Sequence, residues 1–196
     1  MKRIALFAVL GFCMVVPSLM MAQTYDHGEV GVFADYLRLQ QATPAINFVG
    51  VGARVGFNVH PNVALEGEMA YDFKRNTTTL FSDGINTQFV QTRFRPLTAM
   101  FGPKFQAGTS GPFRVFVTGK VGFVNFATTN QGVLAGFTSQ VSGITDGNTH
   151  FAVYPGGGVE GFWGPFGLRL DVGDEIYFAN GTQNNLKVTF GPHIRF

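Results

Sequence analysis

The C-terminal stretch KVTFGPHIRF, residues 187–196, decides the fold. Every second residue in it is apolar or proline, and the positions between carry polar or charged groups and one glycine. The apolar phase is Val188, Phe190, Pro192, Ile194 and Phe196. Strict alternation is typical of a β-strand with one apolar and one polar face. The chain is therefore predicted to end on such a strand.

Seven further segments alternate with the same period of two. They cover residues 29–37, 49–59, 63–73, 97–105, 113–123, 151–160 and 166–175. In the clearest of them, Val51, Val55 and Phe57 alternate with Gly52, Arg54 and other small or polar residues. Eight such segments predict an all-β chain.

The composition tells us how these strands are arranged. Hydrophobic residues make up 45% of the chain and charged residues 13%, against roughly 25% charged in soluble domains. After residue 22 no apolar block is long enough for a membrane helix. Only helices and closed barrels satisfy every backbone hydrogen bond in lipid. The prediction is an eight-stranded antiparallel up-and-down transmembrane β-barrel.

The connections between the segments alternate in length. Those near Pro61, Ser110 and Gly164 are short, whereas the links over residues 40–46, 74–93, 125–149 and 177–185 are longer. Outer-membrane barrels have short periplasmic turns and longer external loops. Both termini are therefore expected on the periplasmic side.

Residues 1–22 have the pattern of a secretory signal peptide. Lys2 and Arg3 precede an apolar run, and Ala22 suits the last residue before cleavage. Residues 23–196 then form one outer-membrane β-barrel domain with 12 basic and 12 acidic residues, which offers no basic surface for nucleic acid. Cys13, the sole cysteine, lies in the signal; a lipoprotein cleavage site there is the alternative, but bulky Phe12 does not suit it.

The polar face of the strands is expected to line the barrel. A soluble lipocalin-like barrel, the alternative, would turn its apolar face inward. Eight strands leave an interior that side chains fill, so the charges there should pair. Folding about the short turns predicts the pairs Arg54–Glu68 and Glu160–Arg169, and the last loop brings Glu175 near Lys187. The predicted lumen charge network is Arg54, Glu66, Glu68, Lys104, Arg114, Lys120, Glu160, Arg169, Asp171, Glu175, Lys187 and Arg195.

Three prolines fall within the predicted strands. Pro103, Pro155 and Pro192 lie on the outward phase next to glycines. Proline donates no ladder hydrogen bond, so bulges or bends are expected at these positions.

The chain resembles the small OmpA-like outer-membrane β-barrel domains. The resemblance covers nearly all of residues 23–196 and includes residues 100–104, residues 155–160 and the terminal Phe196. It implies an outer-membrane location and an assembly signal in the last strand, formed by Phe190, Ile194 and Phe196, that the barrel-assembly machinery would read. A periplasmic peptidoglycan-binding domain does not follow the barrel, so cell-wall anchoring is not implied.

The sequence offers no catalytic, cofactor or metal site. A serine nucleophile needs a histidine within reach as its base, yet His27, His60, His150 and His193 have no serine two residues away. The histidine spacings also fit no metal site. His193 falls on the inward phase of the last strand and is interpreted as a neutral lumen residue.

The longer connections are expected to carry any recognition. Residues 77–92 alternate around Ser82-Asp83-Gly84-Ile85, which predicts a ribbon that continues past the membrane. Residues 132–143 contain apolar side chains, which are expected either to bind a partner or to pack across the barrel mouth. The leading function is a monomeric, non-enzymatic outer-membrane barrel in contact with lipid, with a structural and adhesion-like role towards an unidentified external ligand. The alternative is a narrow ion-conducting pore gated by the lumen salt bridges.

Overall fold

The computed structural model describes residues 27–40, 45–82, 87–108, 110–131, 148–179 and 181–196. The predicted signal peptide, the turn at 83–86 and the apolar stretch at 132–143 lie outside the described residues. Among the residues described, no helix is long and apolar enough to cross a membrane.

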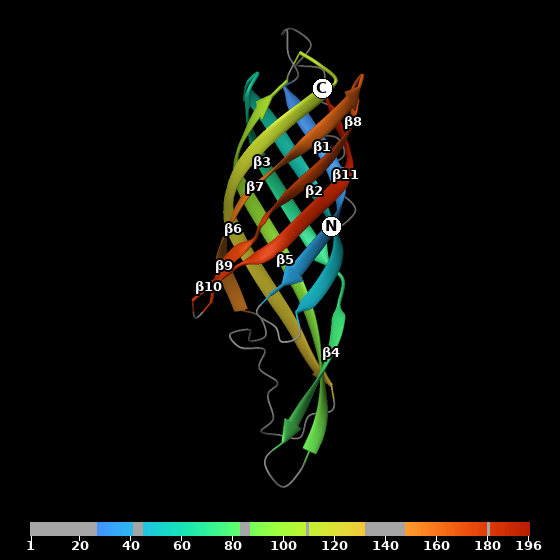
Figure 1. Cartoon of the computed structure of the whole chain (residues 1–196), viewed down its shortest axis with the longest axis vertical. Helices are drawn as coiled ribbons and strands as arrows, with labels where there is room; N and C mark the ends of the chain where they lie inside the picture. The colour runs from blue at the N-terminus through green and yellow to red at the C-terminus, as the bar shows by residue number, and fades with distance from the viewer. Residues whose placement is uncertain (1–26, 41–44, 83–86, 109, 132–147, 180) are drawn as a thin grey trace, which may run out of the picture.

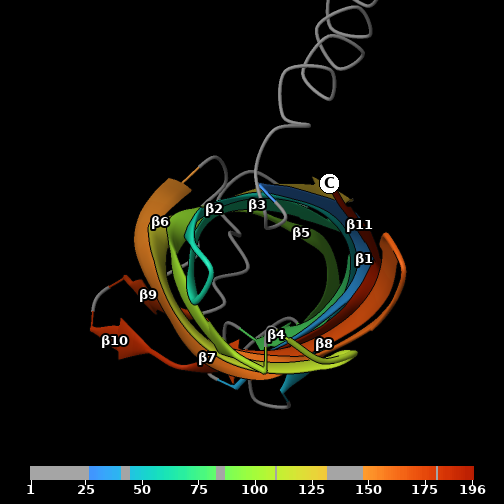
Figure 2. The ribbon, with the colours of Figure 1, turned by 90° about the horizontal axis from the view of Figure 1, so that it is seen from above.

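Eight strands form the wall of the barrel, one for each predicted segment. They are β1 (Gly28–Leu39), β2 (Ile46–His60), β3 (Val63–Asp72), β5 (Thr87–Ala107), β6 (Phe113–Gln131), β7 (Asn148–Trp163), β8 (Phe166–Asp174) and β11 (Asn185–Arg195). Each pairs antiparallel with its neighbours along the chain, and β1 pairs with β11. The ring is therefore closed, as Figure 2 shows from one end, and the predicted fold class is confirmed.

Three further strands lie at one end of the ring. β4 (Arg75–Ser82) pairs with the first part of β5, from Arg75 opposite Phe94 to Ser82 opposite Thr87, and projects beyond the ring (Figure 1). This pairing confirms the predicted ribbon. The short strands β9 (Ile176–Phe178) and β10 (Thr182–Gln183) pair with each other, and β9 also pairs with β7.

The two ends of the barrel differ. The start of β1 and the end of β11 meet at Glu29 and Arg195, and the amide of Gly28 donates to the carbonyl of Phe196 at 2.9 Å. The links at Pro61, Gly111 and Gly164 lie at this end, which we call the short-turn end. The ribbon and β9–β10 lie at the opposite, long-loop end.

Alternation along the strands divides the side chains between two environments. Val51, Phe101, Val117 and Leu170 face outward and are 40 to 61% exposed. Residues of the other phase, such as Glu66 and Lys104, are buried inside the ring. The outside is apolar and the inside charged, which excludes the lipocalin-like alternative, whose apolar face would point inward.

Bulges or bends are predicted at the three prolines, and the register shows that none of them forms a bulge. Pro192 pairs with Leu168 of β8, while the ladder to β1 is interrupted between the pairs Gly31–His193 and Ala34–Phe190. The offset between the strands is the same on both sides of this gap. Pro103 and Pro155 likewise stay paired with the strand on one side. On the other side the ladder is interrupted at each proline, but its register does not shift. Because proline lacks only the backbone N–H donor, hydrogen bonds are lost locally and the register of the strands is unchanged.

Candidate functional site

The interior of the barrel is the candidate functional site. The structure places every residue of the predicted lumen charge network on the interior phase of its strand or at the strand end. These residues lie in successive layers along the barrel axis, which we call levels, and each level contains a different set of charged groups.

Lys104 is the central cation of the level near the short-turn end. Its ammonium is fully buried and lies 2.8 Å from Glu29 Oε2 and 3.0 Å from Glu160 Oε1. Glu66 Oε1 lies 3.2 Å away on a third strand, and Arg114 Nη1 reaches Glu29 Oε1 at 3.3 Å. A buried ammonium without such partners would cost several kcal/mol, so this group depends on its carboxylates.

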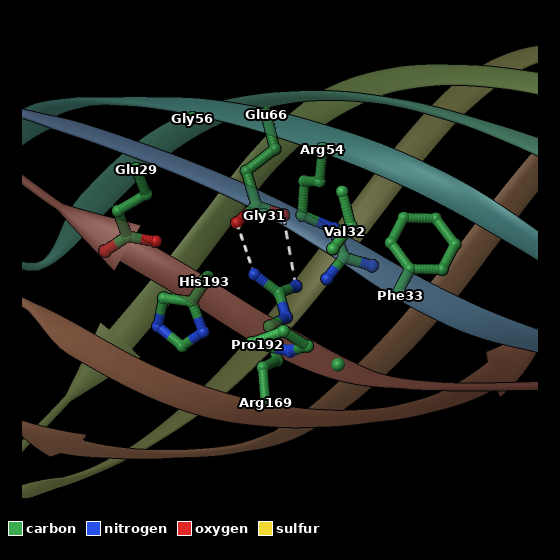
Figure 3. A pocket seen from close by; sticks show the side chains of 11 residues that line it. Glu29, Gly31, Val32, Phe33, Arg54, Gly56, Glu66, Arg169, Pro192 and His193 are labelled. Carbon is green, nitrogen blue, oxygen red and sulfur yellow. Dashed lines mark hydrogen bonds and ion pairs between the residues drawn. The ribbon is translucent and has the colours of Figure 1, made fainter.

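Arg169 crosses the lumen from β8 to β3. Its two terminal nitrogens contact the two oxygens of Glu66 at 2.5 and 3.1 Å, the dashed pair in Figure 3. Nη2 also donates to Asp171 at 2.8 Å, and Nη1 to Glu160 at 3.1 Å. The guanidinium lies 3.9 Å above the centre of the Phe116 ring. Bidentate pairing of this kind fixes geometry as well as charge.

Glu68 joins two cations at the next level. Its Oε2 accepts from Lys120 Nζ at 2.7 Å and from Arg54 Nε at 2.9 Å. Arg54 and Glu68 are directly opposite in the register of β2 and β3, and Glu160 and Arg169 are opposite in β7 and β8. Both predicted cross-strand pairs are therefore confirmed.

The level nearest the long-loop end has an excess of carboxylates. Lys187 Nζ lies 2.8 Å from Glu175 Oε2, as the last loop predicts, and 3.7 Å from Asp35 Oδ2. Asp35 and Asp72 flank Gly50 on the two neighbouring strands. All four of their carboxylate oxygens are buried and accept no hydrogen bond within the described structure. Buried polar groups are normally satisfied, so this level is less well compensated than the others.

An apolar layer separates the charges from the long-loop end, and the sequence reasoning missed it. Leu37, Phe48, Val124 and Phe126 are at most 1% exposed, and Phe126 packs edge-on against Tyr177 with ring centres 5.2 Å apart. These residues share the interior phase with the charges. The sequence contains a pattern that could have revealed this layer: the inward-facing residues become apolar near the long-loop ends of β1, β2 and β6.

One cavity among the charges near the short-turn end is small. A cavity of about 20 Å³, bordered by Glu29, Glu66, Arg169 and His193 among others (Figure 3), is large enough for about one water molecule. The interior at this level is thus filled by side chains, as expected for eight strands.

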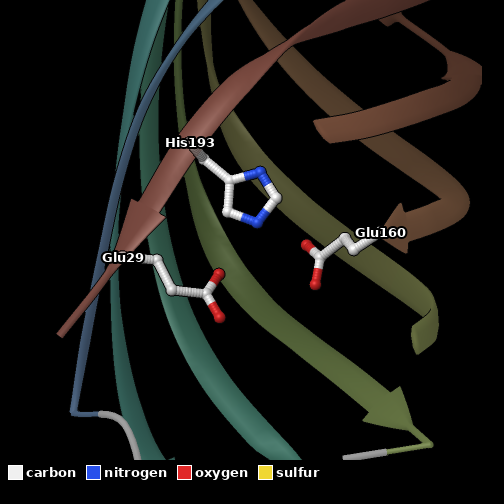
Figure 4. Close-up of side chains that lie close together, drawn as sticks. All are labelled: Glu29, Glu160 and His193. Carbon is white, nitrogen blue, oxygen red and sulfur yellow. The ribbon is translucent and has the colours of Figure 1, made fainter. Parts of the chain in front are cut away.

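A cluster that combines a histidine with two carboxylates lies at the short-turn end (Figure 4). One ligand atom each of Glu29, Glu160 and His193 lies within 4.8 Å of the others, and both ring nitrogens of His193 are buried without a hydrogen-bond partner. Histidine spacing alone missed it because the carboxylates come from other strands. Lys104, Arg114 and Arg169 already bind the two glutamates. A divalent ion would add positive charge to a balanced group, so the arrangement does not fit a metal centre.

The remaining predicted residues lie at the end of the chain. Arg195 stacks on Phe162, with its guanidinium 4.3 Å from the ring centre, and donates to the carbonyl of Gly164 at 3.1 Å. It thus covers the mouth at the short-turn end. Phe190, Ile194 and Phe196 face outward and are 53, 47 and 38% exposed.

Comparison with known proteins places the fold. No family model and no curated protein sequence matches the chain. Ail, the attachment invasion locus protein of Yersinia pestis, matches 88% of this chain and 100% of its own with a TM-score of 0.55 and 13% identity. A second Ail structure, in complex with the heparin analogue sucrose octasulfate, covers the same fractions of the two chains with a TM-score of 0.53 and 14% identity. Neisserial surface protein A matches 86% of this chain and 97% of its own, with a TM-score of 0.57 and 12% identity.

These similarities concern the fold. The chain has the closed eight-stranded β-barrel of small outer-membrane proteins, in agreement with the predicted resemblance.

Proposed function

We propose that this eight-stranded barrel spans the bacterial outer membrane as a closed, non-enzymatic scaffold that presents its long-loop end at the cell surface. The observation that carries the proposal is the filled interior. Lys104, Lys120 and Lys187 are at most 1% exposed and each contacts a carboxylate within 2.8 Å. The apolar layer around Phe48 and Phe126 then covers these charges.

The apolar outer wall supports a membrane location. Outward residues of β2, β5 and β6 such as Val51, Phe101 and Val117 would be costly in water as one continuous surface. Pairing of β1 with β11 leaves no open edge, as lipid requires. A closed ring also needs no second subunit, so we propose a monomer. A signal peptide cleaved after Ala22 would bring it to the periplasm, where the last strand would guide assembly.

Planar-bilayer recording tests the closed scaffold. Wild-type barrel should show no steady conductance, because ions would have to pass the paired charges and the apolar layer. Phe48→Ala with Phe126→Ala should open a leak, and Phe123→Ala, an outward residue of the same strand β6, is the matched control. Steady wild-type channels would instead favour a narrow ion-conducting pore. The buried carboxylates of Asp35 and Asp72, which accept no hydrogen bond within the described structure, are the observation that speaks for that second function.

We further propose that the projecting β4–β5 ribbon has an adhesion-like role. Loops and extensions on a rigid scaffold commonly carry recognition. Ail, which shares the fold, is named for attachment, and one of its structures holds a heparin analogue. Replacing residues 77–91 by a short Gly-Ser linker should reduce the binding of expressing cells to immobilised heparin or host cells. Unchanged binding, with equal surface expression, would refute the role of the ribbon.

A further inference from the structure

The charges outside the lumen are unevenly distributed. At the long-loop end, Arg38, Lys74 and Arg75 are exposed and Arg93 and Arg95 half-buried. Among the described acidic residues, Asp174 is the one that lies outside the lumen at this end. Its carboxylate is already occupied by Asn184 and by the amide of Asn185, at 2.9 and 2.7 Å. Among the described residues outside the lumen, basic side chains therefore outnumber acidic ones at this end.

The arginines stand where the apolar outer wall ends. On β1, the outward phase runs through Val32, Ala34 and Tyr36 to Arg38. On β5, read in the opposite direction along the chain, it runs from Phe101 through Leu97 to Arg95 and then Arg93. Tyr71 and Phe73 precede Arg75 in the same way. On β1, and on β3 continuing into β4, the order is apolar, aromatic, basic, and on β5 the apolar residues are followed directly by the arginines. This is the order of environments from a bilayer core to its charged surface.

Arg75, Arg93 and Arg95 are held in place by neutral partners. Arg95 donates from Nη1 to the hydroxyl of Tyr71 at 2.8 Å, and its guanidinium lies 4.9 Å from the centre of that ring. Arg75 Nε donates to the carbonyl of Asn47 at 2.9 Å, and Asn47 is the register partner of Arg38. Arg93 Nε donates to Asn76 Oδ1 at 3.1 Å. Such contacts orient the guanidinium groups without cancelling their charge.

Positive charge without an acidic partner points to an anionic ligand. No described carboxylate forms an ion pair with any of the four arginines. A guanidinium matches a phosphate through two parallel hydrogen bonds, which a lysine cannot provide.

We propose that Arg38, Arg75, Arg93 and Arg95 form a phosphate-binding rim for anionic lipid headgroups of the outer leaflet. The inference rests on the proposed function, which puts this end at the outer membrane surface. A lipid is favoured over a soluble anion because the four side chains follow the outward phase of the wall and continue its apolar surface, instead of turning into the barrel mouth.

Lipid retention by the purified barrel tests the rim. The test compares wild type with a quadruple variant, Arg38→Gln/Arg75→Gln/Arg93→Gln/Arg95→Gln. Neither protein carries a charged affinity tag. Each is titrated in detergent with diphosphorylated lipid A, and the bound lipid is measured by native mass spectrometry. Lipid A without its phosphates keeps the acyl chains and is the matched ligand control. Wild type should bind the phosphorylated form about tenfold or more tightly than the variant, with the difference reduced at high salt.

The outcomes separate the rim from the barrel itself. Insertion of both proteins into phosphatidylcholine vesicles, followed by circular dichroism and heat-modifiable gel mobility, tests the membrane-spanning fold without any phosphorylated glycolipid. Failure there would overturn the proposed function. Normal insertion with equal binding of both lipid forms would overturn the rim alone. Tight binding of soluble sucrose octasulfate that the four substitutions abolish, with lipid retention unchanged, would also overturn it, because the rim would then serve a soluble polyanion.

Discussion

Removing the carboxylate of Glu68 should destabilise the barrel strongly. In Glu68→Ala, the carboxylate that Lys120 keeps among the described residues is Glu66 Oε2 at 3.3 Å, and Arg54 keeps Asp171 Oδ2 at 3.5 Å. Both contacts are longer than the 2.7 Å contacts that are lost. The Glu68 and Lys120 side chains are at most 1% exposed, so solvent does not compensate them. Breaking a buried pair of this kind costs on the order of 3 to 5 kcal/mol.

A double-mutant cycle isolates the interaction. Lys120→Met removes the second charge and keeps a side chain of similar length, so Glu68→Ala with Lys120→Met should recover part of the loss. We expect a coupling energy of roughly 1 to 3 kcal/mol. Val121→Met, the outward neighbour on β6, is the control for a change of side chain without a change of charge.

Reversible unfolding in lipid vesicles provides the measurement. Trp163 is the only tryptophan, lies at the end of β7 and is 60% exposed, so its fluorescence reports the barrel wall. Guanidinium titrations give the free energy of unfolding for each variant. If the effects of the two substitutions add within about 0.5 kcal/mol, the charges do not interact in a dry interior. The closed, salt-bridged lumen would then be refuted.

Two other substitutions and one deletion test separate parts of the structure. Asp72→Asn should stabilise the barrel by about 1 kcal/mol or more in the same titration, because it removes a buried carboxylate that has no hydrogen-bond partner among the described residues; a loss of stability would mean that an unseen cation or proton compensates it. Val117→Arg, on the outer wall, should cost ~2 to 4 kcal/mol near the membrane centre, whereas a midpoint equal to wild type would place this face away from lipid. Deleting Phe196 should leave secretion intact but cause periplasmic accumulation in cell fractionation, and an undiminished outer-membrane yield would contradict the assembly signal.

Local pattern determined the strands and the orientation of their side chains. A period of two assigns each residue to the inside or the outside once a strand exists, as Val51 and Arg54 illustrate on β2. Short turns fix which residues are opposite on adjacent strands, so Arg54–Glu68 and Glu160–Arg169 followed from residues near one another in the chain. The ribbon of β4 and β5 followed in the same way.

Only the tertiary structure decided which residues meet across the lumen. Arg169 and Glu66 are 103 positions apart, and Lys104 and Glu29 are 75 apart. Their contact depends on the tilt of the strands and on the stagger with which β1 closes against β11, and neither quantity is encoded in a single strand. The same closure brings Phe48 of β2 and Phe126 of β6 together in one apolar layer. Alternation specifies a side chain's face, whereas its height in the barrel and its partner across the lumen arise only when the whole sheet closes.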